Sequence, residues 1–478
     1  MKYLEIAINQ ALCLGADYAD IRIQCTTQEV IYLEDTNFKQ NARGTTYGYG
    51  IRVLKDGAWG FSHSNVFTEE AVIKTTQRAF EIAKYSAMLK KGEGIKLANE
   101  KSYIAKYETP VKKDLFSVPI KEKTNLILEI SKRMLNYAPI KKTRIMFTCK
   151  KDEKLFASTI GTQLEINTCY VNPMITAYAF NDDDNQSRDF DEGGRAVGWE
   201  WIESLDLINK ADTIAQEAIV KVNAEVLKDE TRRDLILDPN HLGLTMHESV
   251  GHPTELDRVL GWEADFAGVS FATPEKLGNY QYGSSIVSFV GDNTLQEGLA
   301  TAGFDDDGVP AQKWYIIKDG ILNEYGTTRE TAPFIGLDYS RGCNRATSYY
   351  DFPMNRIPNL YLLPGKEIYS TSDMIRDTND GVYIQGRGSF SIDQHRVNFQ
   401  FGGDYFWEVK NGKLLRPLKK VLYRSNNPEF WNSCDAICDE RFWRPFGVVN
   451  CGKGQPMQAA RMTHGAAPAR FKNIRVGG

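Results

Sequence analysis

The second half of the chain repeats one pattern, in which short stretches of alternating apolar and polar residues are separated by turn sequences. Alternation places the apolar side chains on one face of a strand, and Asp-Gly or Asn-Gly pairs are favoured where a hairpin reverses direction. From residue 285 onward such turn sequences lie at 305–308, 318–320, 379–381 and 410–412. The pattern therefore predicts a mostly antiparallel β-sheet for this half of the chain, with few helices.

The first part of the chain mixes helical and strand periodicity. Apolar residues recur with helical spacing over residues 3–14 and 67–88. Between these helices, strand alternation lies at 18–24, 29–33, 47–53 and 58–61, with turn sequences at 40–44 and 55–57. The pattern predicts a mixed α/β unit with an antiparallel sheet.

Two further segments divide the chain. Residues 89–118 are polar and Lys-rich, which predicts a connector, and helical patterns follow at 119–137 and 204–227. The charged segment 228–233 then predicts a domain boundary. Because 478 residues exceed what one hydrophobic core usually supports, we expect an α+β protein of two domains. These are a mixed α/β N-terminal domain at 1–230 and a β-rich C-terminal domain at 231–478, which carries the motif helix considered below.

Composition excludes several classes of function. The net charge is −4, and no basic stripe suitable for nucleic acid is present, so we expect no direct nucleic-acid partner. No stretch approaches the roughly 18 apolar residues of a transmembrane helix, and the first residues lack the pattern of a secretory signal. The eight cysteines are scattered and do not form a disulfide framework. We therefore expect a soluble, cytoplasmic protein with no membrane partner.

The segment His247 to His252, with the sequence His-Glu-Ser-Val-Gly-His, is the part of the chain best suited to bind a metal. In the His-Glu-x-x-His zinc motif the two imidazoles lie about 40° apart around one helix, whereas the extra residue here places them about 140° apart. A shared metal therefore requires a π-type bulge or a helix end at His252. Gly251, through unusual backbone angles, and Pro253, by excluding His252 from the α region, are candidate causes. By spacing alone, a metal site and a chance His-Glu pair both remain open.

A catalytic zinc keeps three protein ligands and one open position, so a third ligand must come from elsewhere. Cys451 is a candidate because a glycine-rich bend with Lys453 follows it, and a neighbouring cation lowers the pKa of a thiol. The alternative for Cys451 is an ordinary buried thiol. The other candidates are Glu255, Asp257, Glu263, Asp265, His395, His464 and the pair Cys434 and Cys438, for which core packing is the favoured interpretation.

Several segments along nearly the whole chain resemble the TldD/PmbA family, whose members are regarded as zinc metallopeptidases and have also been described as modulators of DNA gyrase. The resembling segments are Gly15–Arg22, His247–His252, Phe304–Ala311, Val409–Lys413, Cys451–Gln455 and Asn473–Gly477. The His-Glu-x-x-x-His segment is similar to the TldD-like branch, since the TldE or PmbA branch typically lacks it. Pro253 departs from the small, flexible residue expected there, which leaves the shape of the substrate groove open.

The resemblance implies one zinc ion per active subunit, held by His247, His252 and Cys451, with Glu248 as general base. His464 and Gly251 are further candidates for a role beside the metal or the substrate. The resemblance also implies peptide substrates, extended or unfolded. It implies a dimer as well, formed with a second copy or with a TldE/PmbA-like paralogue.

Two other classes of function remain open at this point. In the first, the chain is a non-catalytic regulatory protein that modulates DNA gyrase or another partner, and the histidines are structural. In the second, Cys451 and a histidine form the nucleophile and base of a cysteine hydrolase. Nucleotide cofactors are not expected, because the phosphate-binding glycine motifs are absent from the sequence.

Overall fold

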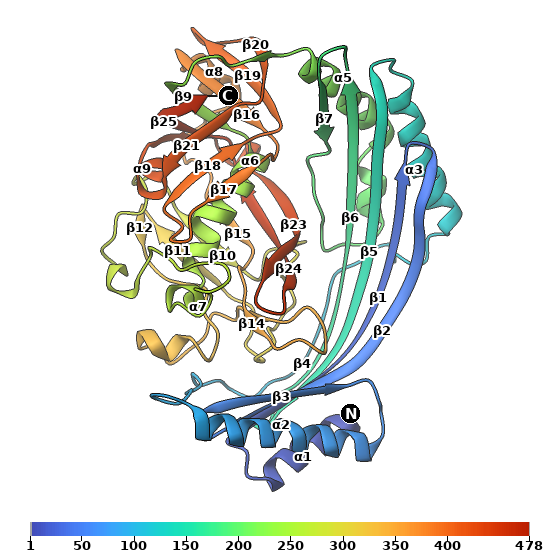
Figure 1. The fold of residues 1–478 in the computed structure, drawn as a ribbon, viewed down its shortest axis with the longest axis vertical. Coiled ribbons are helices and arrows are strands. Elements are labelled where there is room, and N and C mark those ends of the chain that lie inside the picture. Colours follow the sequence, from blue (N-terminus) through green and yellow to red (C-terminus); the bar gives the residue numbers. More distant parts are fainter. Residues whose placement is uncertain (1, 478) are drawn as a thin grey trace.

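Four long strands dominate the first third of the chain in the computed structural model, which describes residues 2–477. β1, β2, β5 and β6 contain 17, 19, 19 and 18 residues. They belong to a seven-stranded sheet with the order β3-β2-β1-β5-β6-β4, in which β7 also pairs with β6. The strands are β1 (Tyr18–Glu34), β2 (Asn37–Lys55), β3 (Ala58–Ser64), β4 (Ile104–Glu108), β5 (Ile140–Ser158), β6 (Gln163–Phe180) and β7 (Asn185–Asp189). Figure 1 shows this sheet as a curved layer beside the rest of the molecule.

Helices cover the seven-stranded sheet at its two ends and create two separate hydrophobic cores. At one end, α1 (Lys2–Cys13) packs over β1 and α2 (Glu69–Leu89) over β2 and β3, around buried residues such as Ile21 and Tyr49. At the other end, α3 (Ile120–Leu135) and α5 (Leu207–Val222) pack against β5 and β6, and the short α4 (Glu200–Ser204) precedes α5. The open length of sheet between these cores faces the C-terminal body, residues 225–477 (Figure 1).

One prediction for this part of the chain was wrong. Residues 40–44, expected as a turn, lie inside β2 and pair with β1, with Gln40 opposite Tyr32. The reversal occurs earlier, at Asp35, which adopts a φ of 54° that Asp tolerates better than most residues. The segment 89–118, expected as a connector, also contains β4, a strand that the sequence did not predict and that pairs in parallel with β6.

The C-terminal body is built from two large sheets with one core between them, and the predicted α+β class with a mostly antiparallel C-terminal half is confirmed. The six-stranded sheet has the order β12-β11-β10-β15-β24-β23. Its strands are β10 (Phe289–Asp292), β11 (Lys313–Lys318), β12 (Ile321–Leu322), β15 (Leu360–Leu362), β23 (Arg444–Lys453) and β24 (Gln458–Ala466). β23 therefore forms one edge of this sheet.

The second large sheet of the C-terminal body has ten strands in the order β17-β18-β21-β25-β9-β16-β19-β20-β8, with β22 paired to β25. Its strands are β8 (Glu225–Val226), β9 (Thr231–Leu237), β16 (Asp380–Gln385), β17 (Phe390–Ile392), β18 (Asn398–Gly402), β19 (Tyr405–Lys410), β20 (Lys413–Lys419), β21 (Leu422–Asn426), β22 (Cys434–Ile437) and β25 (Ala469–Gly477). Smaller elements are β13 (Asn344–Arg345), β14 (Met354–Asn355), α7 (Leu256–Val259), α8 (Thr371–Arg376), α9 (Asn427–Asn432) and short 3₁₀ turns at Pro274–Lys276, Ala332–Ile335 and Glu440–Phe442.

Three of the predicted hairpin turns share one backbone conformation. Their two central residues both have positive φ, as type I′ turns require: Asp56 and Gly57, Asp319 and Gly320, Asn411 and Gly412. These turns join β2 to β3, β11 to β12 and β19 to β20. The similar sequence at 379–381 is not a hairpin but leads from α8 into β16.

Buried ion pairs connect the seven-stranded sheet to the C-terminal body. Asp306 of the body contacts Arg22 of β1 and Lys154 of β5, and its neighbour Asp307 contacts Arg52 of β2, whose Nη2 lies 2.8 Å from Asp307 Oδ1. Arg52 also pairs with Asp20 within the sheet. Because all these groups are shielded from water, each carboxylate depends on its cation, and the acidic turn at 305–308 acts as the attachment between the two parts.

We predict that Arg52→Met lowers the free energy of unfolding by about 3–5 kcal/mol, because it leaves two buried carboxylates without their cation. Urea unfolding followed by tryptophan fluorescence measures the change. The matched control is Lys74→Met, which removes a cation from the solvent-exposed pair with Glu70 on α2 and should leave the transition unchanged. Equal transitions for the two variants would contradict the role given to Arg52.

Candidate metal centre

The helix that carries the motif is held at its start by a buried N-cap. α6 (Pro239–Met246) begins after Asp238, whose side chain accepts a hydrogen bond of 2.7 Å from the backbone N–H of His241. Pro239 occupies the first helical position, where its fixed φ is favourable and its missing N–H costs nothing. α6 packs against β23, β24 and β16, so both sheets of the C-terminal body contact the motif helix.

One turn of π-helix follows α6 and solves the spacing problem of the motif. In the turn His247–Gly251, the backbone N–H of His252 donates to the carbonyl oxygen of His247, five residues earlier, and a 3₁₀ turn at His252–Thr254 follows. The widened turn brings the two imidazole rings to a centroid separation of 4.8 Å. Of the two distortions considered from the sequence, the π-type bulge is the one present.

The two causes proposed for this distortion were wrong. Gly251 has an ordinary right-handed conformation, with φ −57° and ψ −62°, and His252 remains in the α region at φ −63° and ψ −41° in spite of Pro253. Gly251 is needed for space instead: a Cβ there would lie 2.9 Å from Ile357 Cδ1 and 3.4 Å from Leu360 Cδ2.

The carbonyl of Ser249, inside the widened turn, finds partners outside the helix. It accepts hydrogen bonds from the hydroxyl of Tyr282 and from the side-chain amide of Asn427. The Ser249 hydroxyl in turn accepts from Trp431 Nε1 at 3.0 Å. A buried carbonyl without a partner would be costly, so these side chains stabilise the π turn in its observed form.

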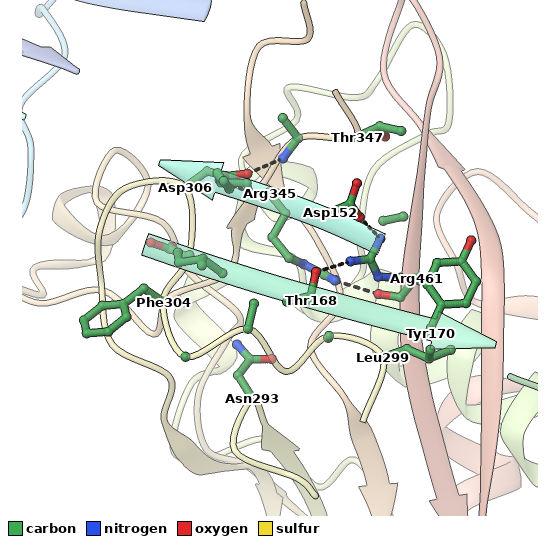
Figure 2. Close-up of a pocket in the computed structure, with 18 of the residues that line it drawn as sticks. Asp152, Thr168, Tyr170, Asn293, Leu299, Phe304, Asp306, Arg345, Thr347 and Arg461 are labelled. Carbon is green, nitrogen blue, oxygen red and sulfur yellow. Dashed lines mark hydrogen bonds and ion pairs between the residues drawn. The ribbon is translucent and has the colours of Figure 1, made fainter. Parts of the chain in front are cut away.

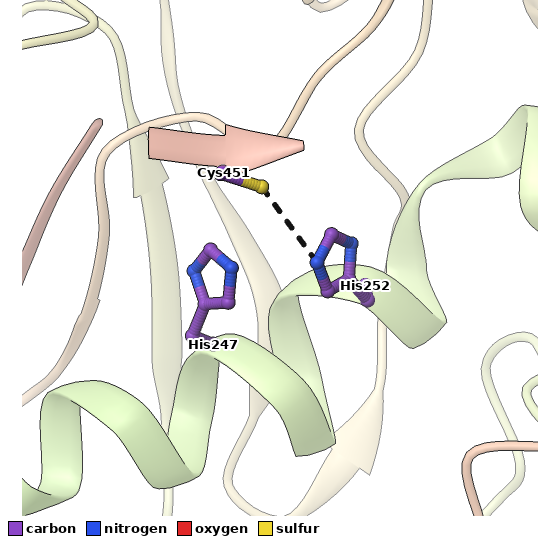
Figure 3. Close-up of side chains that lie close together, drawn as sticks. All are labelled: His247, His252 and Cys451. Atoms are coloured by element: carbon purple, nitrogen blue, oxygen red, sulfur yellow. Dashed lines mark hydrogen bonds between the residues drawn. The ribbon is translucent and has the colours of Figure 1, made fainter. Parts of the chain in front are cut away.

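His247, His252 and Cys451 converge into one buried group (Figure 3). One ligand atom from each residue lies within 4.8 Å of the others, and Cys451 Sγ is 3.7 Å from His252 Nε2. Cys451 comes from β23, about 200 residues away from the histidines in sequence. Glu263, Asp265, His395, Cys434 and Cys438 are not part of this group. Cys434 and Cys438 lie in the hydrophobic core instead.

The Nδ1 atoms of His247 and His252 are both engaged in hydrogen bonds, so their Nε2 atoms are the ones that can bind a metal. His252 Nδ1 lies 2.7 Å from Glu255 Oε2, and this carboxylate can only accept, so Nδ1 carries the proton. His464 directs Nδ1 to the carbonyl oxygen of Leu360 at 3.3 Å, which leaves its Nε2 as the acceptor for His247 Nδ1 at 2.7 Å. Such partners fix the orientation of metal-binding imidazoles.

The electrostatics of the group suit a zinc ion. Burial lowers the pKa of both His247 and His252, which keeps the rings neutral. Burial raises the pKa of the Cys451 thiol, but His252 and Arg356 lower it below its usual value, so the thiol and the His252 ring compete for one proton across the 3.7 Å contact. A metal ion that displaced this proton would meet two neutral imidazoles and a thiolate, the donor set of catalytic zinc. The ligand atoms of a tetrahedral zinc lie about 3.5 Å apart, close to the observed sulfur–nitrogen distance.

Arg396 is a residue of this region that sequence reasoning missed. It lies in the turn between β17 and β18 with a φ of 61°. Its Nη1 is 2.8 Å from Glu248 Oε2, and both side chains are largely buried. Within residues 2–477, Glu248 Oε1 has no hydrogen-bond partner. No spacing pattern links residue 396 to residue 248, so only the fold reveals this pair.

Family models place this fold and site in a known context. Three models of the PmbA/TldA metallopeptidase family match the chain: domain 1 at residues 19–83, the central domain at 113–224 and the C-terminal domain at 230–478. The C-terminal match contains all three residues of the metal-ligand group. The chain therefore belongs to the PmbA/TldA metallopeptidase family, and the resemblance noted from its motifs is confirmed.

Relatives of similar length carry names of the same class. A metalloprotease from Methanocaldococcus jannaschii is 29% identical over 441 residues, which cover 91% of this chain and 92% of the relative. A protein from Saccharolobus solfataricus named as a zinc metalloprotease and TldD homologue is 23% identical, with 98% of this chain and 99% of the relative covered. This chain is thus a metallopeptidase by family.

Solved structures show the same fold at low sequence identity. A candidate modulator of a DNA gyrase from Thermotoga maritima aligns with a TM-score of 0.78 at 18% identity, over 99% of each chain. TldE from Thermococcus kodakarensis aligns with a TM-score of 0.72 at 15% identity, over 100% of each chain. Among residues 2–477 no helix combines the length and apolar content needed to cross a membrane.

We predict that Gly251→Ala destabilises the protein by about 1–3 kcal/mol, because the new methyl group overlaps Ile357 and pushes the π turn out of place. Gly243→Ala, on the preceding turn of α6, is the control: its Cβ meets only ordinary contacts at 3.6 Å, and Ala favours a helix by up to about 1 kcal/mol. Thermal unfolding of both variants makes the comparison. A Gly251→Ala protein as stable as Gly243→Ala would show that space at residue 251 is not limiting.

Proposed function

We propose that this protein is a zinc-dependent peptidase that binds one zinc ion through His247, His252 and Cys451. The observation that carries the proposal is the convergence of these three side chains. Glu255 and His464 contact the Nδ1 atoms of the two histidines and leave both Nε2 atoms to the metal. The relative from Saccharolobus solfataricus, named as a zinc metalloprotease, supports the choice of metal. Gly251 contributes by leaving the π turn the room it needs.

Glu248 is the proposed general base. A zinc ion held by these three residues would supply a Lewis acid for the scissile carbonyl and would lower the pKa of a bound water towards about 7. Glu248 follows the first ligand directly in sequence, and its free Oε1 can take a proton and later give it to the leaving amine. Arg396 holds Oε2, so the carboxylate has a fixed orientation when it acts. A thiolate ligand reduces Lewis acidity, which predicts modest turnover.

The substrate class proposed is an extended or unfolded peptide. Cys451 lies on β23, and β23 is an edge strand of the six-stranded sheet. A peptide that adds to such an edge is bound by backbone hydrogen bonds, which require an extended conformation and select little among side chains. Addition to β23 would bring a peptide bond beside the metal-ligand group.

A dimer, either with a second copy or with a TldE/PmbA-like paralogue, is the assembly that we propose. The fold shared with TldE from Thermococcus kodakarensis supports a partnership between related chains. We further propose the cytoplasm as its compartment, in line with eight cysteines that form no disulfide.

The first test is the metal content of purified protein. We expect about one zinc per chain in the wild type by plasma mass spectrometry, and loss of stoichiometric zinc in Cys451→Ala, because two histidines alone are a poor site. Cys13→Ala, at an exposed cysteine on α1, is the matched control and should keep its zinc. Absence of zinc from both wild type and control would favour the alternative of a non-catalytic regulatory protein.

The second test separates the base from the ligands. We expect Glu248→Gln to lower hydrolysis of an unfolded peptide by at least about 10²-fold, because general-base catalysis contributes roughly 10²–10⁴, while zinc content stays at the wild-type value. Release of peptide fragments followed by mass spectrometry gives the rate. Full activity of Glu248→Gln would remove Glu248 as base, and activity that resists chelation but is lost on thiol alkylation would indicate Cys451 as a nucleophile.

A further inference from the structure

A cavity lies between the seven-stranded sheet and the C-terminal body, and the metal-ligand group is not part of its lining (Figure 2). Its volume is about 250 Å³, and its walls come from β1, β5 and β6 on one side and from segments 293–311, 342–347 and 449–461 on the other. Interfaces between parts of a chain are frequent locations of small-molecule sites.

The hairpin of β23 and β24 separates this cavity from the metal-ligand group. Side chains alternate along a strand, and directly opposed residues share a face. Along β24, Met462 and His464 lie on the side of the hairpin that faces the motif, where His464 contacts His247, and Cys451 of β23 reaches His252 from the same side. Arg461 precedes Met462 and points to the other face, where it contributes to the cavity wall. The two sites therefore use opposite faces of one hairpin.

The ion pairs in the cavity wall leave positive charge without a full counter-charge. Arg461 holds Asp152 at 2.9 Å, and Lys154 holds Asp306, which also pairs with Arg22. Lys150 is left with a single distant contact, 3.4 Å from an oxygen of the same Asp152. Burial lowers the pKa of Lys150, because the charged ammonium group loses contact with water. A nearby anion would stabilise the charged form again.

Arg345 adds a second uncompensated cation. Its guanidinium donates to the backbone carbonyls of Arg461 and Ile357, both at 2.6 Å, and within residues 2–477 it has no carboxylate partner within 4.0 Å. The remaining acid of the wall, Asp305, accepts three backbone N–H groups. Both oxygens of Asp305 are thus engaged by the backbone, and Arg345 has no ion pair with this acid.

The wall also contains acceptors without donors and a small apolar surface. Gln24 Oε1 and Asn293 Oδ1 are buried and have no hydrogen-bond partner within residues 2–477. The apolar part of the lining is made mostly of small side chains, among them Ala300, Ala302 and Ala459. The volume lies below the roughly 300–1,000 Å³ typical of drug-sized ligands, so the cavity suits a smaller molecule.

We propose that this cavity binds the α-carboxylate and adjacent N–H group of a small apolar amino acid, either free or at the C-terminus of a peptide. The carboxylate lies against Lys150 and Arg345, the N–H donors satisfy Gln24 and Asn293, and the alanines contact a short apolar side chain. Binding requires neither the metal nor hydrolysis, so the site is independent of the proposed peptidase chemistry.

The test is calorimetric titration of the full-length, zinc-depleted protein with L-alanine, N-acetyl-L-alanine and L-alaninamide. We expect saturable binding of at least one of the first two and none of the amide, which lacks the carboxylate. Tighter binding of L-alanine identifies the free amino acid as the ligand, and tighter binding of N-acetyl-L-alanine identifies a peptide C-terminus. Saturable binding of the amide alone, or of no probe, overturns the proposal.

Variants locate the binding in the cavity. Lys150→Gln should raise the dissociation constant about tenfold or more, the usual effect of losing one hydrogen bond to a charged group. Lys151→Gln is the matched control, because Lys151 is the next residue of β5, faces the other side of the sheet and pairs with exposed Glu153. Ala302→Leu fills the cavity without changing charge and should abolish binding. Equal affinities for Lys150→Gln and Lys151→Gln, or undiminished binding by Ala302→Leu, overturn the proposal.

Discussion

The carbonyl of Ser249 in the π turn cannot accept from Pro253, four residues later, because proline has no N–H, and its need for an outside partner organises the centre of the C-terminal body. The carbonyl of Ser249 is satisfied by Tyr282 and Asn427, and the Ser249 hydroxyl is held by Trp431. Asn427 and Trp431 belong to α9, and Tyr282 comes from a segment about 145 residues earlier in the sequence. The π turn is therefore stable only in the assembled body, and the two histidines acquire their relation to each other only there.

The same dependence on assembly holds for the third member of the metal-ligand group. Cys451 approaches the histidines because β23 pairs with β24 and α6 packs against both strands. Glu255 and His464 then set the tautomers, and Lys453, two residues after Cys451, holds Glu255 at 3.1 Å. Ligands and supporting groups thus come from two segments, 247–255 and 451–464, that interlock on one face of a hairpin.

Local features of the sequence were enough to predict much of this molecule. Alternation and turn chemistry predicted the antiparallel C-terminal half and three hairpin turns, and the helices α1, α2, α3 and α5 lie close to their expected positions. The turn assigned to 40–44 failed because polar residues in a solvent-exposed strand look like a turn. β4 was missed because a single polar strand acquires its identity from β6, with which it pairs.

The metal-ligand group could be anticipated only in part. The histidine pair and the need for a distorted helix follow from spacing, whereas Cys451 was singled out by its glycine-rich surroundings and by the family resemblance. The reason for Gly251 could not be found in sequence, since it depends on Ile357. The contact between Glu248 and Arg396 likewise depends on a turn between β17 and β18 that approaches the motif helix from another sheet.

The hairpin of β23 and β24 has a consequence for how the two sites communicate. Cys451 and Arg461 stand on opposite faces of the same pair of strands, with no other element between them. A ligand that shifted the hairpin from one side would change the position of the thiol on the other. Any such effect would be reciprocal: the metal would alter the affinity of the cavity by the same factor as the cavity ligand alters that of the metal. The two strands would then couple the metal-ligand group to the cavity.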